Sequence, residues 1–170
     1  MSQASPENRP NRRLYTDEQR ARRDSTYWTT VQAILAPLQF LVFAISLVLV
    51  LRYLVTGDGY TAATVSILIK TAILYTIMVT GAIWEKIVFG QYLFAPAFFW
   101  EDVFSFGVIA LHTWYVYALL SGDVSPQGQM LIALAAYATY VVNAVQFLWK
   151  LRMARLDEKL AAATKDEVAA

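Results

Sequence analysis

Three carboxyl side chains flank a short aromatic segment near the middle of the chain. Glu85 lies at its start, and Glu101 and Asp102 lie at its end. The aromatic side chains between them are Phe89, Tyr92, Phe94, Phe98, Phe99 and Trp100. Long apolar runs precede and follow this segment, so its ionisable groups sit at a membrane boundary, where they are costly unless they have a use. The pattern predicts a site that joins acid–base groups to a surface for a flat, hydrophobic molecule.

The reactive side chains of this sequence suit acid–base chemistry. It has no cysteine and no Ser–His–Asp arrangement, zinc-ligand spacing or dinucleotide-binding motif. Burial and a like-charged neighbour both favour the protonated form of a carboxyl group. One member of the trio can then act as a general acid while another stays ionised and orients a water. The alternative is an ordinary interfacial charge cluster with Lys86 as its salt-bridge partner.

Four long apolar runs must position these groups. The chain has 170 residues, of which 58% are hydrophobic and 16% charged, whereas a soluble domain carries about 25% charged residues. Each run is long enough to cross a bilayer as a helix. We therefore expect an all-α integral membrane protein, a four-transmembrane-helix bundle with spans at residues 30–55, 62–84, 97–120 and 129–149.

The polar ends set the domain limits and the orientation. We expect a disordered tail at 1–13, a transmembrane domain at 14–155 and a C-terminal tail at 156–170. Thr16 and Gln19 fit a capping box, which predicts a short amphipathic helix at the lipid headgroups. A plain positive-inside flank with no role in the chemistry is the alternative. Lys and Arg cluster before the first span and after the last, so both termini and the loop between the second and third spans are predicted to be cytoplasmic.

Polar side chains recur at helical spacing inside the spans. In the first span they are Gln32, Gln39, Ser46 and Tyr53, and in the last Thr139, Asn143, Gln146 and Lys150, with Tyr137 and Tyr140 nearby. Hydrogen bonding between helices and one wall of a polar pocket both explain such stripes. Lys70 is placed within about two turns of the outer end of its predicted span, where a lysine can extend its amine to the interface.

His112 is the only histidine. It follows Glu101 by eleven residues, so the two share a helix face about 16 Å apart along the axis. A hydrogen-bonded packing role and ligation of a metal carried by a bound ligand both stay open. One histidine without a second protein ligand gives little support for a dedicated metal site, so no intrinsic metal is expected.

Several long segments carry a resemblance to a known family. They are LYTDEQRARRD (14–24), ILAPLQFLVF (34–43), LYTIMVTGAIWEKIVFGQYLFAPAFFWEDVFS (74–105), ALHT (110–113) and QMLIALAAYATYVVNAVQFL (129–148). They resemble the 2-vinyl bacteriochlorophyllide hydratases of bacteriochlorophyll biosynthesis. The likeness covers nearly the whole chain apart from the two tails, and the central motif is long and unusual in composition.

The resemblance implies addition of water across the C3-vinyl group of a chlorophyllide or bacteriochlorophyllide, giving a 3-(1-hydroxyethyl) product. Protonation of the terminal vinyl carbon leaves a cation delocalised into the macrocycle, which water then attacks. Glu101 is the expected acid, and Glu85 or Asp102 the expected base for the water. No cofactor is expected, since the substrate carries its own magnesium.

The chemistry of such a substrate suggests which residues bind it. Tyr92, Phe98 and Trp100 would hold the macrocycle, Lys86 its propionate, His112 its magnesium or a nearby group, and Gln39, Tyr140 and Asn143 would line the pocket.

The expected location is the bacterial inner, intracytoplasmic photosynthetic membrane. Membrane lipid is the expected environment, and the net charge of +1 gives no field for nucleic acid. A homo-oligomer or contact with other bacteriochlorophyll-pathway enzymes stays open. The alternative function is a non-catalytic tetrapyrrole carrier or photosystem assembly scaffold, which would use the aromatic residues, His112 and Lys86 but not three carboxyl groups.

Overall fold

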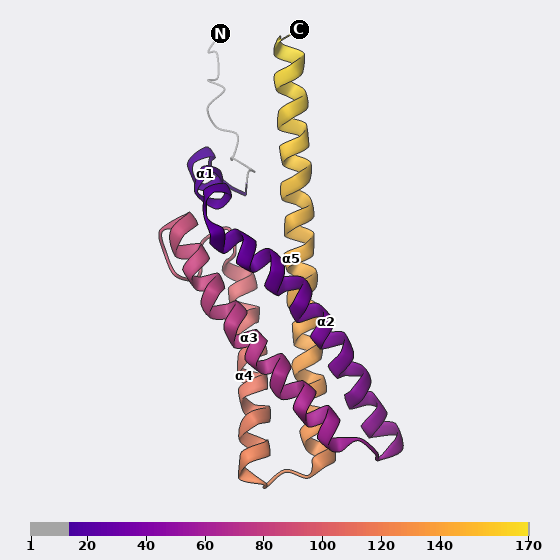
Figure 1. Cartoon of the computed structure of the whole chain (residues 1–170). Coiled ribbons are helices and arrows are strands. Elements are labelled where there is room, and N and C mark those ends of the chain that lie inside the picture. Colours follow the sequence, from indigo (N-terminus) through magenta and orange to yellow (C-terminus); the bar gives the residue numbers. More distant parts are fainter. Residues whose placement is uncertain (1–13, 170) are drawn as a thin grey trace, which may run out of the picture.

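The computed structural model describes residues 14–169, with side chains for residues 14–156 and Lys159. Within this range the chain forms five helices: α1 (Asp17–Ser25), α2 (Tyr27–Thr56), α3 (Tyr60–Phe89), α4 (Phe99–Ser121) and α5 (Pro126–Ala169) (Figure 1). The Thr16–Gln19 capping box that precedes α1 is confirmed, with both of its reciprocal hydrogen bonds present. The tail predicted at 1–13 lies outside the described residues.

Four helices are long and apolar enough to cross a membrane. They are α2, α3, α4 and the Pro126–Leu156 part of α5. The all-α architecture with four membrane-length apolar helices is therefore confirmed. Three of the predicted spans lie inside an observed helix, and the span predicted at 97–120 begins two residues before α4. Their outer faces carry exposed aliphatic side chains such as Leu41, Ile45 and Val48, as expected where lipid replaces water as the surrounding solvent.

Helix α3 continues further than its predicted end at Trp84. It runs through Phe89 and stops at Gly90, whose φ of 87° gives the left-handed C-cap conformation that glycine adopts without strain. Glu85 and Lys86 therefore belong to the last turns of α3 and not to the loop that follows. This places Glu85 on a rigid element.

The four spans form two antiparallel hairpins that cross one another. The first joins α2 to α3 through residues 57–59, and the second joins α4 to α5 through residues 122–125. In Figure 1 the first hairpin runs obliquely across the second, and α1, the α3–α4 loop and the C-terminal end of α5 lie at the same end of the bundle. That shared end is where the candidate site forms.

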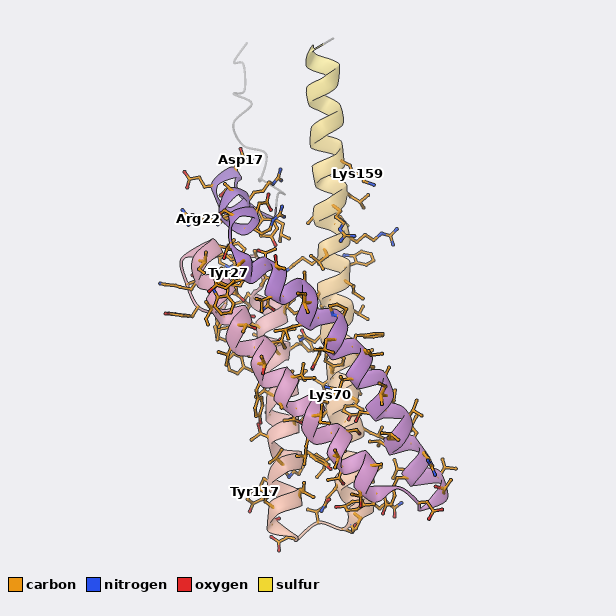
Figure 2. The ribbon with its side chains drawn as sticks, viewed as in Figure 1. Asp17, Arg22, Tyr27, Lys70, Tyr117 and Lys159 are labelled. Carbon is orange, nitrogen blue, oxygen red and sulfur yellow. The ribbon has the colours of Figure 1, made fainter. Side chains whose placement is uncertain are left out.

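Lys70 lies in the middle of the bundle and does not extend to its end (Figure 2). The predicted extension to the interface is wrong because Lys70 faces the interior of the bundle, where its amine contacts His112. Its side chain is fully buried, its Nζ is 3.0 Å from Nε2 of His112, and it lies 4.3 Å from the ring centroid of Tyr140. The aromatic rings around the amine compensate in part for lost hydration.

The hydrogen bonds of His112 define its tautomer. Nδ1 is 2.8 Å from the carbonyl oxygen of Val108. A carbonyl only accepts, so Nδ1 carries the hydrogen, and Nε2 is left to accept from Lys70. This bond joins α3 of the first hairpin to α4 of the second. Both ring nitrogens are thereby engaged, which matches the hydrogen-bonded packing role that the sequence left open.

Removing one partner of this pair is predicted to cost more stability than removing both. His112→Leu leaves the Lys70 amine buried without its acceptor, and we expect the free energy of unfolding to fall by about 3 kcal/mol. Lys70→Met combined with His112→Leu replaces both groups with apolar side chains and should recover most of that loss. The five tryptophans allow the thermal midpoints to be measured by intrinsic fluorescence in detergent. A double variant as unstable as His112→Leu alone would contradict the prediction.

Candidate active site

The three carboxyl groups lie together at the end of the bundle that carries α1. Glu85 comes from the end of α3, and Glu101 and Asp102 come from the first turn of α4. Each residue is 5% exposed or less. Asp102 follows Phe98 by one turn, and its backbone N–H donates to the Phe98 carbonyl. Two helix ends and one connecting loop therefore build the cluster.

The loop between α3 and α4 binds two of the carboxyl groups through its backbone. The Phe94 N–H donates to Oδ2 of Asp102 at 2.6 Å, and the Ala95 N–H donates to Oε2 of Glu85 at 3.3 Å. Phe94 has a φ of 59°, a left-handed conformation that is uncommon for a bulky residue. The short bond that the Phe94 N–H donates to Asp102 helps to hold the loop in this strained form, as is common beside functional sites.

Glu85 and Asp102 also hydrogen-bond to each other through their side chains. Two ionised carboxylates can only accept, so a bond between them requires that one carries a proton. A proton on either group would thus be shared in a buried position. This is the arrangement that a general acid needs if a second carboxylate is to act beside it.

Lys150 of α5 completes the cluster, although the sequence did not single it out as a site residue. Its Nζ lies 2.6 Å from Oε2 of Glu101 and also donates to the carbonyl oxygen of Ala97. One signal was present, since Asn143 and Lys150 lie on one polar stripe. Asn143 indeed donates to Ser105, one turn from Glu101, at 2.8 Å.

Lys86 is not the salt-bridge partner of the cluster. It is exposed, its Nζ donates to the carbonyl oxygen of Gly90 at 2.7 Å, and it lies 5.3 Å from the ring centroid of Tyr92. The interfacial-cluster alternative named the wrong cation because Lys86 and Glu85 are adjacent in a helix and point in different directions. Lys86 and Tyr92 instead form a cationic and aromatic edge at the surface of the loop.

The aromatic residues near the cluster divide into two groups. An inner aromatic cluster contains Tyr15, Trp84, Phe89, Phe98 and Phe147. An outer aromatic face, exposed at the surface, contains Tyr92, Phe94, Phe99, Trp100 and Phe106. In the outer face the Phe94 and Phe106 rings stack with centroids 5.5 Å apart and planes 10° apart.

Phe98 belongs to the interior, unlike the other aromatic residues predicted to hold a macrocycle. It is 4% exposed, whereas Tyr92 is 60% and Trp100 65% exposed. Lys150 Nζ lies 5.0 Å from the Phe98 ring centroid. Phe98 therefore forms an apolar wall of the carboxyl cluster, and only Tyr92 and Trp100 of the predicted set offer free surface.

The remaining predicted residues lie deeper in the bundle. Gln39, Tyr140 and His112 are buried near Lys70, about 16 Å from the carboxyl cluster along α4. Asn143 lies one turn beyond Tyr140, between the Lys70–His112 pair and the carboxyl cluster. For His112 to ligate a metal, Lys70 would have to leave Nε2.

Comparison with known proteins assigns the chain to a family. The profile of the family described as 2-vinyl bacteriochlorophyllide hydratase (BCHF) matches residues 15–153. The chain belongs to this family. A protein of Cereibacter sphaeroides named 2-vinyl bacteriochlorophyllide hydratase is 80% identical over 153 residues, covering 89% of this chain and 94% of that protein.

A second relative carries the same name. It comes from Rhodobacter capsulatus, is 75% identical over 152 residues, and the match covers 89% of this chain and 88% of the relative. No solved structure matches the chain. The family is one of hydratases, which are hydro-lyases, so the chain is an enzyme that acts in bacteriochlorophyll biosynthesis. This favours catalysis over the carrier or scaffold alternative.

The bond from Phe94 to Asp102 predicts how the loop responds to substitution. Asp102→Ala removes the acceptor and should release the left-handed Phe94. Because such a charge-assisted bond contributes roughly 1.5–3 kcal/mol, deuterium exchange of the Phe94 and Ala95 amides should accelerate about tenfold or more. Asp102→Asn is the matched control, since its side-chain carbonyl still accepts. Equal exchange rates in the two variants would show that the bond does not hold the loop.

Proposed function

We propose that the protein adds water to the vinyl group of a magnesium-containing chlorophyllide or bacteriochlorophyllide, giving the 1-hydroxyethyl product, with no cofactor of its own. The vinyl group is at C3 in systematic ring numbering and at position 2 in the family's name. One observation carries the proposal: the buried carboxyl groups of Glu85 and Asp102, which contact each other, lie beside an exposed aromatic face. The names of the relatives supply the substrate class.

Glu85 is the acid that the contacts favour, although the sequence alone pointed to Glu101. Glu101 is ion-paired with Lys150 at 2.6 Å, which stabilises its carboxylate form. Glu85 lies at the C-terminal end of α3, where the helix dipole disfavours a negative charge, and no cation contacts it among the described residues. Its protonated form is therefore the more stable one.

Asp102 is the favoured base. It lies in the first turn of α4, where the helix dipole stabilises a carboxylate, and its bond from the Phe94 N–H is short at 2.6 Å. The two partners of one hydrogen bond thus occupy helix ends of opposite polarity. This difference gives the acid and the base distinct roles.

Glu85 and Asp102 then account for every proton that the reaction moves. Glu85 gives its proton to the terminal vinyl carbon, and the π electrons of the vinyl group form the new C–H bond. The inner carbon becomes a cation delocalised into the macrocycle. Water forms a C–O bond to that carbon while Asp102 takes one of its protons. The proton returns from Asp102 to Glu85 through their hydrogen bond, which restores the starting state.

The negative charges of the cluster also stabilise the cationic intermediate. Asp102 and Glu101 are both buried, so their fields act over a short distance with little screening by water. Lys150 donates one hydrogen bond to Glu101 and another to the Ala97 carbonyl, and so keeps Glu101 in place. We assign Lys150 a positioning role and not contact with the reacting carbons.

The substrate binds over the outer aromatic face in this proposal. The stacked Phe94 and Phe106 rings and the exposed Trp100 suit a flat macrocycle. Phe94 is also the residue whose N–H bonds Asp102, so the aromatic face and the reactive pair adjoin. Lys86, beside Tyr92 at the loop edge, is the candidate partner for the propionate.

The orientation and location are part of the proposal. The cytoplasmic side is the end that carries α1 and the carboxyl cluster, because the basic residues gather there. Arg22 donates to the Val88 carbonyl and so ties α1 to the end of α3, as expected for an amphipathic helix at the headgroups. The membrane is the bacterial inner photosynthetic membrane.

The direct test is a conversion assay with purified protein in detergent, chlorophyllide a and no added cofactor. We expect a product heavier by one water. In D₂O the new methyl group should carry one carbon-bound deuterium, because the acid proton goes to the terminal carbon. If chlorophyllide a binds unchanged, the assay is repeated with the 3-vinyl bacteriochlorin. Binding of both pigments without hydration of either would overturn the proposed activity.

The assignment of the acid predicts a difference between two matched variants. Glu85→Gln keeps a donor to Asp102 but no acidic proton, so turnover should fall by about 10²- to 10⁴-fold. Pigment binding, followed by absorbance titration, should persist. Glu101→Gln breaks the ion pair with Lys150 but leaves the reactive pair, so it should retain more turnover. The reverse order of the two activities would assign the acid role to Glu101.

A further inference from the structure

A second polar centre lies in the bundle at a distance from the carboxyl cluster. Lys70 and His112 form it, and eleven residues of α4 separate His112 from Glu101, which is about 16 Å. Over the same interval α5 runs from Tyr140 to Lys150. Polar side chains recur along that stretch at almost every turn, first Asn143, which bonds Ser105, and then Gln146. One face of α5 is therefore polar between the two centres.

Several buried polar atoms in this interval have no partner within the protein. Gln39 is 2% exposed, and neither its Nε2 nor its Oε1 has a hydrogen-bond partner among the described residues. The same holds for Oδ1 of Asn143 and Oε1 of Gln146. Lys70 has up to three N–H donors, of which His112 accepts one. Native proteins usually satisfy such buried groups with ordered water.

Ring contacts place Phe43 and Tyr140 at the level of Lys70 in the bundle. The Phe43 ring centroid lies 4.9 Å from that of Tyr140 and 5.9 Å from the Lys70 Nζ. Gln39 precedes Phe43 by one turn on the same buried face, and Asn143 follows Tyr140 by about one turn. Since α2 and α5 run in opposite directions (Figure 1), both steps lead towards the carboxyl cluster. Figure 2 shows Lys70, where the series begins, in the middle of the bundle.

We propose that a file of bound water runs along the inner face of α5 from Lys70 to the carboxyl cluster, and that it supplies the water consumed in hydration. Lys70 and Nε2 of Gln39 donate, whereas Oε1 of Gln39, Oδ1 of Asn143 and Oε1 of Gln146 accept. A mixed set suits water, which does both, better than an anion or a cation. The use of this water in hydration rests on the proposed function, whereas its presence does not.

The file of water would provide a route for water once the macrocycle is bound. A macrocycle over the outer aromatic face covers that side of Asp102, so water must reach the cation from another direction. The bundle interior provides one, ending at the Glu101–Lys150 pair. One water leaves the file in each turnover: its hydroxyl goes to the inner vinyl carbon and its remaining proton to Asp102.

X-ray hydroxyl-radical footprinting in detergent tests for the water itself. Bound water produces radicals locally, so buried side chains beside it are oxidised although bulk radicals do not reach them. We expect oxidation of Phe43 and Tyr140 in the wild-type protein, which are 6% and 8% exposed. Gln39→Leu should reduce that oxidation several-fold and lower kcat about tenfold with KM unchanged, because only the supply of water is impaired.

Gln32→Leu is the matched control. Gln32 is on the same helix, but its Nε2 already donates to Thr80 at 2.8 Å, so its loss should change neither readout. Gln146→Leu tests the file at its other end if Gln39→Leu fails to fold, as judged by thermal unfolding.

Each readout bears on a different part of the inference. Unlabelled Phe43 and Tyr140 in the wild-type protein would overturn the file. Labelling that survives both the Gln39→Leu and the Gln146→Leu substitution would also overturn it. Labelling that is lost without a change in kcat would overturn the supply of water to the reaction. A wild-type protein that shows the footprint but hydrates neither pigment would refute the proposed function and leave the file standing.

Discussion

Ionisable side chains inside this bundle lie in contacting pairs, and that constraint shapes the whole structure. Lys70 bonds His112, Glu85 bonds Asp102, and Lys150 bonds Glu101. The first two pairs each join α3 of one hairpin to α4 of the other, at the middle and at one end of the bundle. In hydrocarbon an unpaired group of this kind is costly. The crossing of the two hairpins is therefore fixed by polar contacts as much as by packing.

The carboxyl cluster shows how the same constraint produces a difference in reactivity. Glu85 and Asp102 are chemically similar and both are buried. They differ in that one ends a helix and the other begins one. The dipoles of α3 and α4 favour a neutral group at the first place and an anion at the second. Antiparallel neighbours joined by a short loop place two such ends together, so the topology alone distinguishes an acid from a base.

The sequence contained enough to predict the helices and the grouping of the carboxyl residues. Apolar runs of membrane length give the spans, and the short segment from Glu85 to Asp102 must connect two neighbouring helix ends. Other features depend on rotation about the helix axis and on packing, which spacing does not define. Lys70 was placed near an interface because the spacing did not show that its side chain faces His112 in the interior. Lys150 was grouped with a polar stripe, but which carboxyl group it would meet depends on how α4 and α5 pack.

The loop escaped prediction for a different reason. Phe94 adopts a left-handed conformation that its residue type disfavours, so no local signal marks it. Phe98 turns inward while Phe99 and Trp100 face out, because α4 begins at Phe99 and its first turn decides which rings are buried. Spacing identified these residues as aromatic neighbours, and only the packed fold divides them into a wall and a surface.

A hydratase within a membrane must combine two opposing conditions. A neutral carboxylic acid close to an alkene needs an apolar setting, since water would lower its effective acidity towards carbon and promote its ionisation. The resulting cation nevertheless needs one water molecule. Here the apolar walls, formed by Phe98 and the outer aromatic face, lie next to the acid, while unpartnered amides lie deeper in the bundle. Separating the two along the helix axis lets the macrocycle stay in a dry environment while water approaches from the protein side. The fold can meet both conditions because successive turns of one helix can place their side chains in different chemical environments.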